Sequence, residues 1–119
     1  MSFFPAYGIS VALSVNDYQQ RPVVWGETNY TEHLTRHPER EYLKSDYYIG
    51  VIETTIQHPY KVDKKDDCTI LYSDGITDQT ISNNTLYMKV IVAYDYYPAH
   101  VRTAFLTTYT RGATMVYSG

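Results

Sequence analysis

The stretch from residue 30 to residue 41 holds a dense set of side chains that could do chemistry. It reads YTEHLTRHPERE and contains His33, Arg36 and His37. Residues three or four apart lie on one face of an α-helix, so these three side chains would share a face. Histidine titrates near neutral pH, and arginine grips phosphate oxygens through its planar guanidinium group. The stretch therefore predicts acid–base chemistry on an anionic substrate.

A metal centre is the first alternative for His33 and His37. Zinc proteases carry the sequence H-E-x-x-H on a helix, and the glutamate acts as general base. This chain has Leu34 in place of that glutamate, and Arg36 would set a positive charge beside the metal. The sequence offers no evident third ligand, so we predict no metal and no cofactor. A nucleophile at Cys68 is not expected either, because the aspartates before it would raise its pKa.

Acid–base cleavage of a phosphodiester fits these residue types better. Metal-independent RNA cleavage needs one group to take the 2′-hydroxyl proton, another to protonate the leaving 5′-oxygen, and cations to hold the charge on phosphate. Further candidates are Lys89, His100, Arg102 and Thr103 on predicted strands, and Tyr109 directly after the last of them. For each residue alone, a solvated surface side chain remains the ordinary alternative.

Composition limits the class of protein. The chain has 119 residues, 44% hydrophobic and 19% charged, which fits one globular domain over residues 1–119. A net charge of −3 argues against a strongly basic, non-specific nucleic-acid binder but leaves room for a local basic pocket. One cysteine permits no internal disulfide and is compatible with a reducing compartment.

The apolar N-terminus, MSFFPAYGISVALSV, has no basic region and is interrupted by Pro5 and Gly8. We therefore predict neither an export signal nor a membrane span, and expect a soluble cytoplasmic protein. Fourteen tyrosines would furnish a sheet or a binding surface.

Two helices are predicted in the first half of the chain. The first starts near Asn29, with Glu32 completing a capping box, and ends before Pro38. The second runs over 39–57, where an apolar stripe recurs at helical spacing. Gly50 would weaken this second helix, which suggests close packing at that point.

Alternating patterns elsewhere predict strands. They cover 9–15, 60–62, 68–73, 85–94 and 100–108, with a short extended piece over 23–25 and a last short strand over 114–117. This order predicts an α+β fold, in which an N-terminal strand and two helices pack on one face of a four- to five-stranded antiparallel sheet.

Several motifs follow one another in a recognisable order. They are Trp25, then H-L-x-R-H-P-E from His33 to Glu39, then I-x-x-T-I-x-x-P from Ile52 to Pro59, then Tyr87 with Lys89 to Val92, and finally Val101, Thr103 and Ala104. Together they resemble the phage-associated branch of the barnase–EndoU–colicin–RelE-like nuclease superfamily. The resemblance covers roughly Trp25 to Tyr109, and it departs from the usual pattern at Phe105, where a tyrosine is common, and in the longer spacing between Trp25 and His33.

The resemblance implies a helical pair followed by a four-stranded antiparallel sheet, and a metal-independent endoribonuclease of the toxin or effector type. RNA would be the substrate, and an antitoxin or immunity protein would be a partner. By position, His33 is the acid–base residue. The predicted catalytic residues are His33, His37, Lys89 and Thr103, and the predicted substrate-binding residues are Arg36, His100, Arg102 and Tyr109.

Two other functions stay open on the sequence alone. The first is a catalytically silent module that binds a protein or RNA on the same scaffold, which Phe105 and the negative net charge favour. The second is a structural or virion-associated phage protein.

Overall fold

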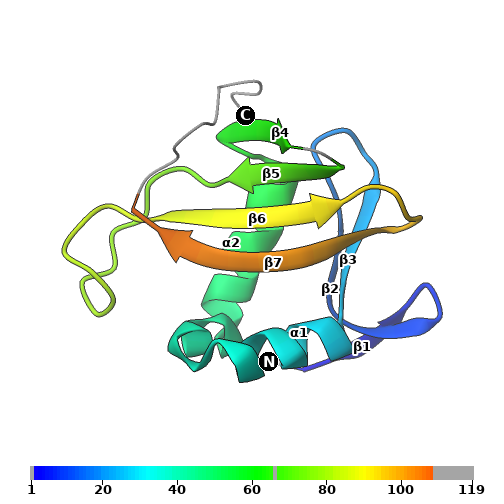
Figure 1. Ribbon diagram of the computed structural model, residues 1–119, viewed down its shortest axis with the longest axis horizontal. Coiled ribbons are helices and arrows are strands. Elements are labelled where there is room, and N and C mark those ends of the chain that lie inside the picture. The colour runs from blue at the N-terminus through cyan, green and yellow to red at the C-terminus, as the bar shows by residue number, and fades with distance from the viewer. Residues whose placement is uncertain (1, 66, 109–119) are drawn as a thin grey trace.

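A seven-stranded mixed sheet and three helical segments make up the computed structural model, which describes residues 2–65 and 67–108 (Figure 1). The strands are β1 (Phe4–Ala6), β2 (Ile9–Asn16), β3 (Pro22–Gly26), β4 (Lys61–Lys65), β5 (Cys68–Tyr72), β6 (Tyr87–Ala93) and β7 (Ala99–Thr107). The helical segments are α1 (Glu27–Arg36), the 3₁₀ helix η1 (Pro38–Lys44) and α2 (Asp46–Gln57). The predicted α+β class is confirmed.

The sheet has the order β1-β2-β3-β7-β6-β5-β4. Strands β4 to β7 form an antiparallel meander, and β1 to β3 form a second antiparallel group. A short parallel pairing joins the two groups, with Val23 opposite Ala99 and Val24 opposite His100. The predicted four- to five-stranded antiparallel sheet is therefore wrong in size and type. Alternation along β2 and β3 indicates strands, but it does not indicate their partner.

The second predicted helix, over 39–57, is in fact two segments. Ser45 has an extended backbone (φ −77°, ψ 144°), and its hydroxyl accepts a hydrogen bond from the backbone N–H of Tyr48, so it caps α2. Residues before it form η1, in which Arg40 departs from helical geometry (φ −99°, ψ 25°). The first helix begins at Glu27, earlier than predicted.

The helical segments lie against different parts of the sheet. Helix α2 crosses behind β5, β6 and β7, whereas α1 and η1 run beside β7 (Figure 1). Helix α2 also contacts β2, so β2 and the meander pack against it together. The largest fully buried side chains are Trp25, Leu13, Leu43, Ile52, Ile56, Leu71 and Met88. Among the described residues, no helix is long and apolar enough to cross a membrane.

Gly50, in the middle of α2, offers a test of local stability. A Cβ atom built there would meet nothing within 4 Å, so the close packing predicted from the sequence is wrong. We expect Gly50→Ala to raise the free energy of unfolding by up to about 1 kcal/mol, because alanine loses less backbone entropy in a helix. Urea denaturation measures the change.

Gly75→Ala is the matched control for that substitution. A Cβ at Gly75 would approach the Thr85 Cγ2 atom to 2.9 Å, so this variant should gain no stability. Unchanged or reduced stability of Gly50→Ala would contradict the prediction.

Candidate functional site

Side chains from α1 and η1 occupy the edge of β7 that β3 leaves open. Strand β3 pairs with β7 only near the start of β7. Further along, the His33 Nε2 atom lies 3.1 Å from the carbonyl oxygen of Ala104, and the Tyr42 hydroxyl accepts a hydrogen bond from the backbone N–H of Leu106 at 2.9 Å. Backbone groups at a strand edge need such partners when they are shielded from water. His33 thus has a structural role, because it supplies a hydrogen-bond partner to the open edge of β7.

Aromatic packing fixes the position of His33. Its ring centroid lies 5.7 Å from that of Trp25, which in turn packs edge-on against Tyr30 at 5.1 Å. The Trp25 indole N–H donates to Asn29 Oδ1 at 2.7 Å and ties β3 to the start of α1. His33 is left with 8% of its surface exposed.

Burial lowers the pKa of His33 below its ordinary value, and the charges of Arg40, His37 and Arg36 lower the pKa further. The hydrogen bond to the Ala104 carbonyl acts in the opposite direction but does not outweigh these effects. His33 is therefore a neutral imidazole at neutral pH, the form that accepts a proton.

Thr103 on β7 provides the second polar contact of the imidazole. A carbonyl oxygen can only accept, so the bond to Ala104 places the ring proton on Nε2 and leaves Nδ1 as an acceptor. The Thr103 Oγ1 atom lies 3.3 Å from Nδ1 and donates to it. Arg40 Nη1 in turn donates to Thr103 Oγ1 at 3.4 Å. Arg40 Nη1 also lies 3.1 Å from His33 Nε2, where its charge opposes protonation of the ring.

Two cations approach the ring of Phe105, the next outward side chain after Thr103 on β7. The Arg40 Cζ atom lies 4.4 Å from the ring centroid, and the Lys89 Nζ atom lies 5.5 Å from it. Lys89 is the direct cross-strand partner of Phe105 on β6. Arginine and lysine are residues that bind phosphate groups, and both lie near this one aromatic ring.

His37 and Arg36, the other two predicted site residues of this stretch, lie differently. His37 stands next to His33, with ring centroids 5.2 Å apart, and its side chain is 40% exposed. Its Nδ1 atom lies 3.2 Å from a Glu39 carboxylate oxygen. Arg36 is 74% exposed and pairs with Glu32 at 3.5 Å, so it points into solvent rather than toward Thr103.

The remaining predicted site residues lie apart from this cluster or fall outside the described residues. Arg102 and His100 line a separate cavity beyond the other end of α1. Tyr109 and the predicted strand over 114–117 lie outside the described residues. The structure thus brings together His33, His37 and Thr103, adds Lys89 through Phe105, and leaves Arg36, His100 and Arg102 outside.

Arg40 is the residue that sequence reasoning missed. The predicted helix over 39–57 contained Arg40 but gave it no role. In the structure His37 has a non-helical backbone (φ −127°, ψ 70°), and the turn at Pro38 brings Arg40 back over Phe105. The position of Arg40 two residues after a proline was the available signal, because a helix ends at or before the residue preceding proline.

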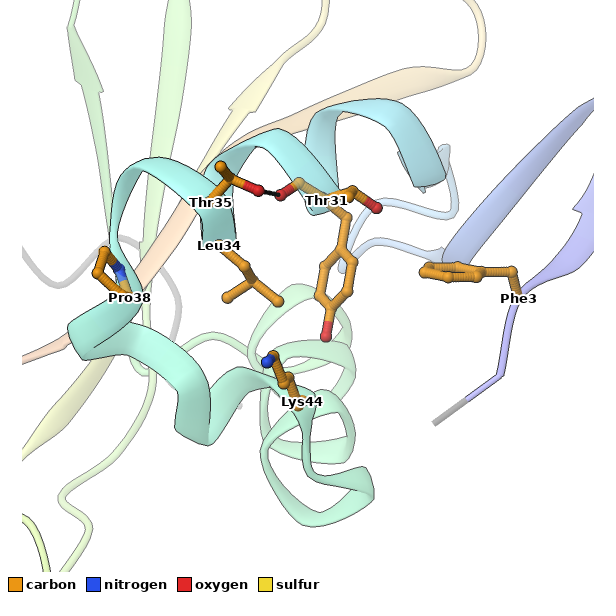
Figure 2. A pocket seen from close by; sticks show the side chains of 7 residues that line it. Phe3, Thr31, Leu34, Thr35, Pro38 and Lys44 are labelled. Atoms are coloured by element: carbon orange, nitrogen blue, oxygen red, sulfur yellow. Dashed lines mark hydrogen bonds between the residues drawn. The ribbon is translucent and has the colours of Figure 1, made fainter.

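A cavity of about 550 Å³ lies on the neighbouring side of α1 (Figure 2). Its lining is mainly apolar, with Lys44 at one side, and neither His33 nor His37 belongs to it. It is lined by Phe3, Tyr30, Thr31, Leu34, Thr35, Pro38 and Lys44.

Within residues 2–65 and 67–108, no three histidine, cysteine or acidic side chains gather as a metal site would require.

The lowered pKa of His33 predicts that folding stability depends on pH. An unfolded chain protonates this histidine near its ordinary pKa of about 6.5, whereas the folded chain resists protonation until lower pH. The unfolded state therefore binds more protons as the pH falls below about 6.5, and the free energy of unfolding should decrease through that range. Urea denaturation of wild type and His33→Gln from about pH 7.5 to about pH 5 measures this. An equal decrease in both proteins would assign the effect to other groups.

No family model, no curated protein and no solved structure matches the chain.

Proposed function

We propose that this chain is a metal-independent endoribonuclease-like protein of the toxin or effector type, which cleaves RNA by acid–base catalysis. The observation that carries the proposal is the hydrogen-bonded pair of His33 and Thr103 beside two cations, Arg40 and Lys89, on the ring of Phe105. A neutral imidazole, a hydroxyl and paired cations are the groups that cleavage of a phosphodiester by its own 2′-hydroxyl requires. The motif resemblance to the phage-associated nucleases supports the same class.

The proposed reaction begins at Thr103. Its hydroxyl receives the proton of the RNA 2′-hydroxyl and passes its own proton to His33 Nδ1. The 2′-oxygen then attacks phosphorus, and the bond from phosphorus to the 5′-oxygen breaks. Protonated His37, which is open to solvent, gives a proton to the leaving 5′-oxygen. The products are a 2′,3′-cyclic phosphate and a 5′-hydroxyl, and Arg40 and Lys89 stabilise the charge that develops on the phosphate oxygens.

Incubation of the purified protein with a labelled RNA in EDTA tests the proposal. We expect cleavage that EDTA does not reduce, with 2′,3′-cyclic phosphate on the new ends. A DNA oligonucleotide of the same sequence is the control, because it has no 2′-hydroxyl and should stay intact. Uncut RNA at high protein concentration, or equal cleavage of the DNA, would contradict the proposal.

Substitutions at Thr103 test the proton relay. Thr103→Val keeps the shape of the side chain but removes the hydroxyl, and we expect it to lower the cleavage rate by roughly 10- to 100-fold. Thr103→Ser keeps the hydroxyl and should stay within about threefold of wild type. Single-turnover rates on one oligonucleotide measure both. Equal rates for the valine and serine variants would remove Thr103 from the mechanism.

A second candidate function is a catalytically silent module that binds RNA or a protein partner. The burial of His33 favours it, because both ring nitrogens already have partners and the imidazole supports the edge of β7. Expression in bacteria separates the two functions. A nuclease should arrest growth unless an antitoxin or immunity protein is present, and His33→Gln should relieve the arrest. A silent module should be tolerated in both forms.

A further inference from the structure

The cavity on the neighbouring side of α1 has the size and the lining of a binding site for a small molecule (Figure 2). Its volume of about 550 Å³ lies within the range of about 300–1,000 Å³ that is usual for ligand pockets. Such pockets combine a mainly apolar lining with a few polar groups that fix the orientation of the ligand. The proposed nuclease mechanism uses none of the residues that line this cavity.

An aromatic wall and an aliphatic side chain give the cavity its apolar character. The rings of Phe3 and Tyr30 meet edge-on, with their centroids 5.7 Å apart. The Tyr30 hydroxyl donates to the carbonyl oxygen of Leu43, so it already has a partner. Half-buried Leu34 lies four residues after Tyr30, one helical turn along the same face of α1. Apolar ligand surface that leaves water for these side chains would be bound favourably.

Lys44 is the one charged side chain among the described residues that line the cavity. It points toward Leu34 (Figure 2), and within residues 2–65 and 67–108 it forms no ion pair. Thr35, another lining residue, already donates its hydroxyl proton to the carbonyl oxygen of Thr31. The Lys44 ammonium group is therefore the donor that is available to a ligand, and it attracts an anionic group and repels a cationic one.

We propose that this cavity binds a small amphipathic carboxylate, such as a medium-chain fatty acid. Its apolar body would lie against the aromatic wall and Leu34, and its carboxylate would meet the ammonium group of Lys44. The lining selects this class of ligand, because a polyanion such as RNA needs several cations and the cavity offers one. The inference goes beyond the proposed nuclease and does not depend on it, since binding here needs no residue of the catalytic site.

Isothermal titration calorimetry with butanoate, hexanoate and octanoate tests the inference. We expect octanoate to bind with a Kd below about 1 mM. Each pair of methylene groups that is removed should weaken binding roughly tenfold, because less apolar surface is buried. Octylammonium has the same chain with the opposite charge, and it should bind to the wild type at least about tenfold more weakly than octanoate.

Lys44→Glu should reverse this preference, so that octylammonium binds more tightly than octanoate. Lys64→Glu is the matched control, because it makes the same change in net charge at an exposed residue of β4, the strand at one edge of the sheet. The control should keep the preference of the wild type. Lys44 is exposed as well, so both variants are expected to fold, and a thermal melt of each checks this.

No binding of octanoate at about 10 mM would overturn the inference, and so would equal affinity for all three chain lengths. An equal change of preference in Lys44→Glu and Lys64→Glu would assign the effect to net charge and not to the cavity. Gel filtration tests the other occupant, a second copy of the chain. A wild-type dimer that Lys44→Glu dissociates would make the cavity part of an interface between copies and would reject the carboxylate site.

Discussion

Replacing His33 with glutamine is expected to lower the rate of RNA cleavage by about 10²- to 10⁴-fold, the usual contribution of a general base. Glutamine has an amide N–H that can still donate to the carbonyl of Ala104, so the edge of β7 keeps its partner. It has no nitrogen that accepts a proton from Thr103. The substitution therefore separates the chemical role of His33 from its structural role.

Single-turnover cleavage and thermal melting should be measured together on wild type, His33→Gln and His33→Ala. We expect both variants to lose activity to this extent, but only His33→Ala to lose substantial stability. The alanine leaves the Ala104 carbonyl without this partner, and a buried polar group without a hydrogen bond costs about 1–3 kcal/mol. A folded His33→Gln protein that cleaves RNA at the wild-type rate would reject His33 as the base and leave it a purely structural residue.

Arg40→Ala is expected to give the second large loss of cleavage rate, and Arg36→Ala is its matched control. The two arginines lie four residues apart in the same stretch, yet Arg40 contacts Thr103 and Phe105 whereas Arg36 pairs with Glu32 in solvent. We expect Arg40→Ala to lower the cleavage rate by about 10²- to 10³-fold, as loss of a charge-stabilising donor does at other active sites. Arg36→Ala should change the rate by less than about threefold, because an exposed ion pair contributes little.

The two arginine variants carry the same change in net charge, so weaker long-range attraction of RNA affects both. Comparing their rates at low and moderate salt removes that shared component. Equal losses in the two variants would mean that the cations act through general attraction of RNA, and the assignment of Arg40 to phosphate binding would be wrong. The melting temperature of each variant gives the control for folding.

Local pattern predicted most of the elements but not their arrangement. Alternation over 85–94 and 100–108 correctly indicated β6 and β7. Capping and proline signals indicated α1, although it starts at Glu27, and the apolar stripe over 39–57 covered the whole of α2. Strand β1 was missed because it is three residues long with Pro5 in the middle, which no period can reveal. The break at Ser45 was missed because the apolar stripe continues across it.

The residues of the candidate site were also predicted only in part. Residue type and motif could be read from the sequence, but contacts between distant segments could not. His33 and Thr103 could be named from residue type and motif, and their contact is present. Arg40 could not, because its direction depends on the backbone turn at His37 and Pro38. The structural role of His33 could not be predicted either, because it depends on where β3 departs from β7. That pairing joins residues 76 positions apart in the sequence.

The distance along the chain between the two halves of the site has a consequence for synthesis. His33 and Thr103 are separated by 70 residues, and Arg40 and Thr103 by 63. Contacts of such long range form late, after the intervening segments have been ordered. A nascent chain on the ribosome therefore lacks the assembled site until β7 has left the exit tunnel. Under the proposed function, the message and the ribosome that produce this chain are spared from it until β7 has emerged.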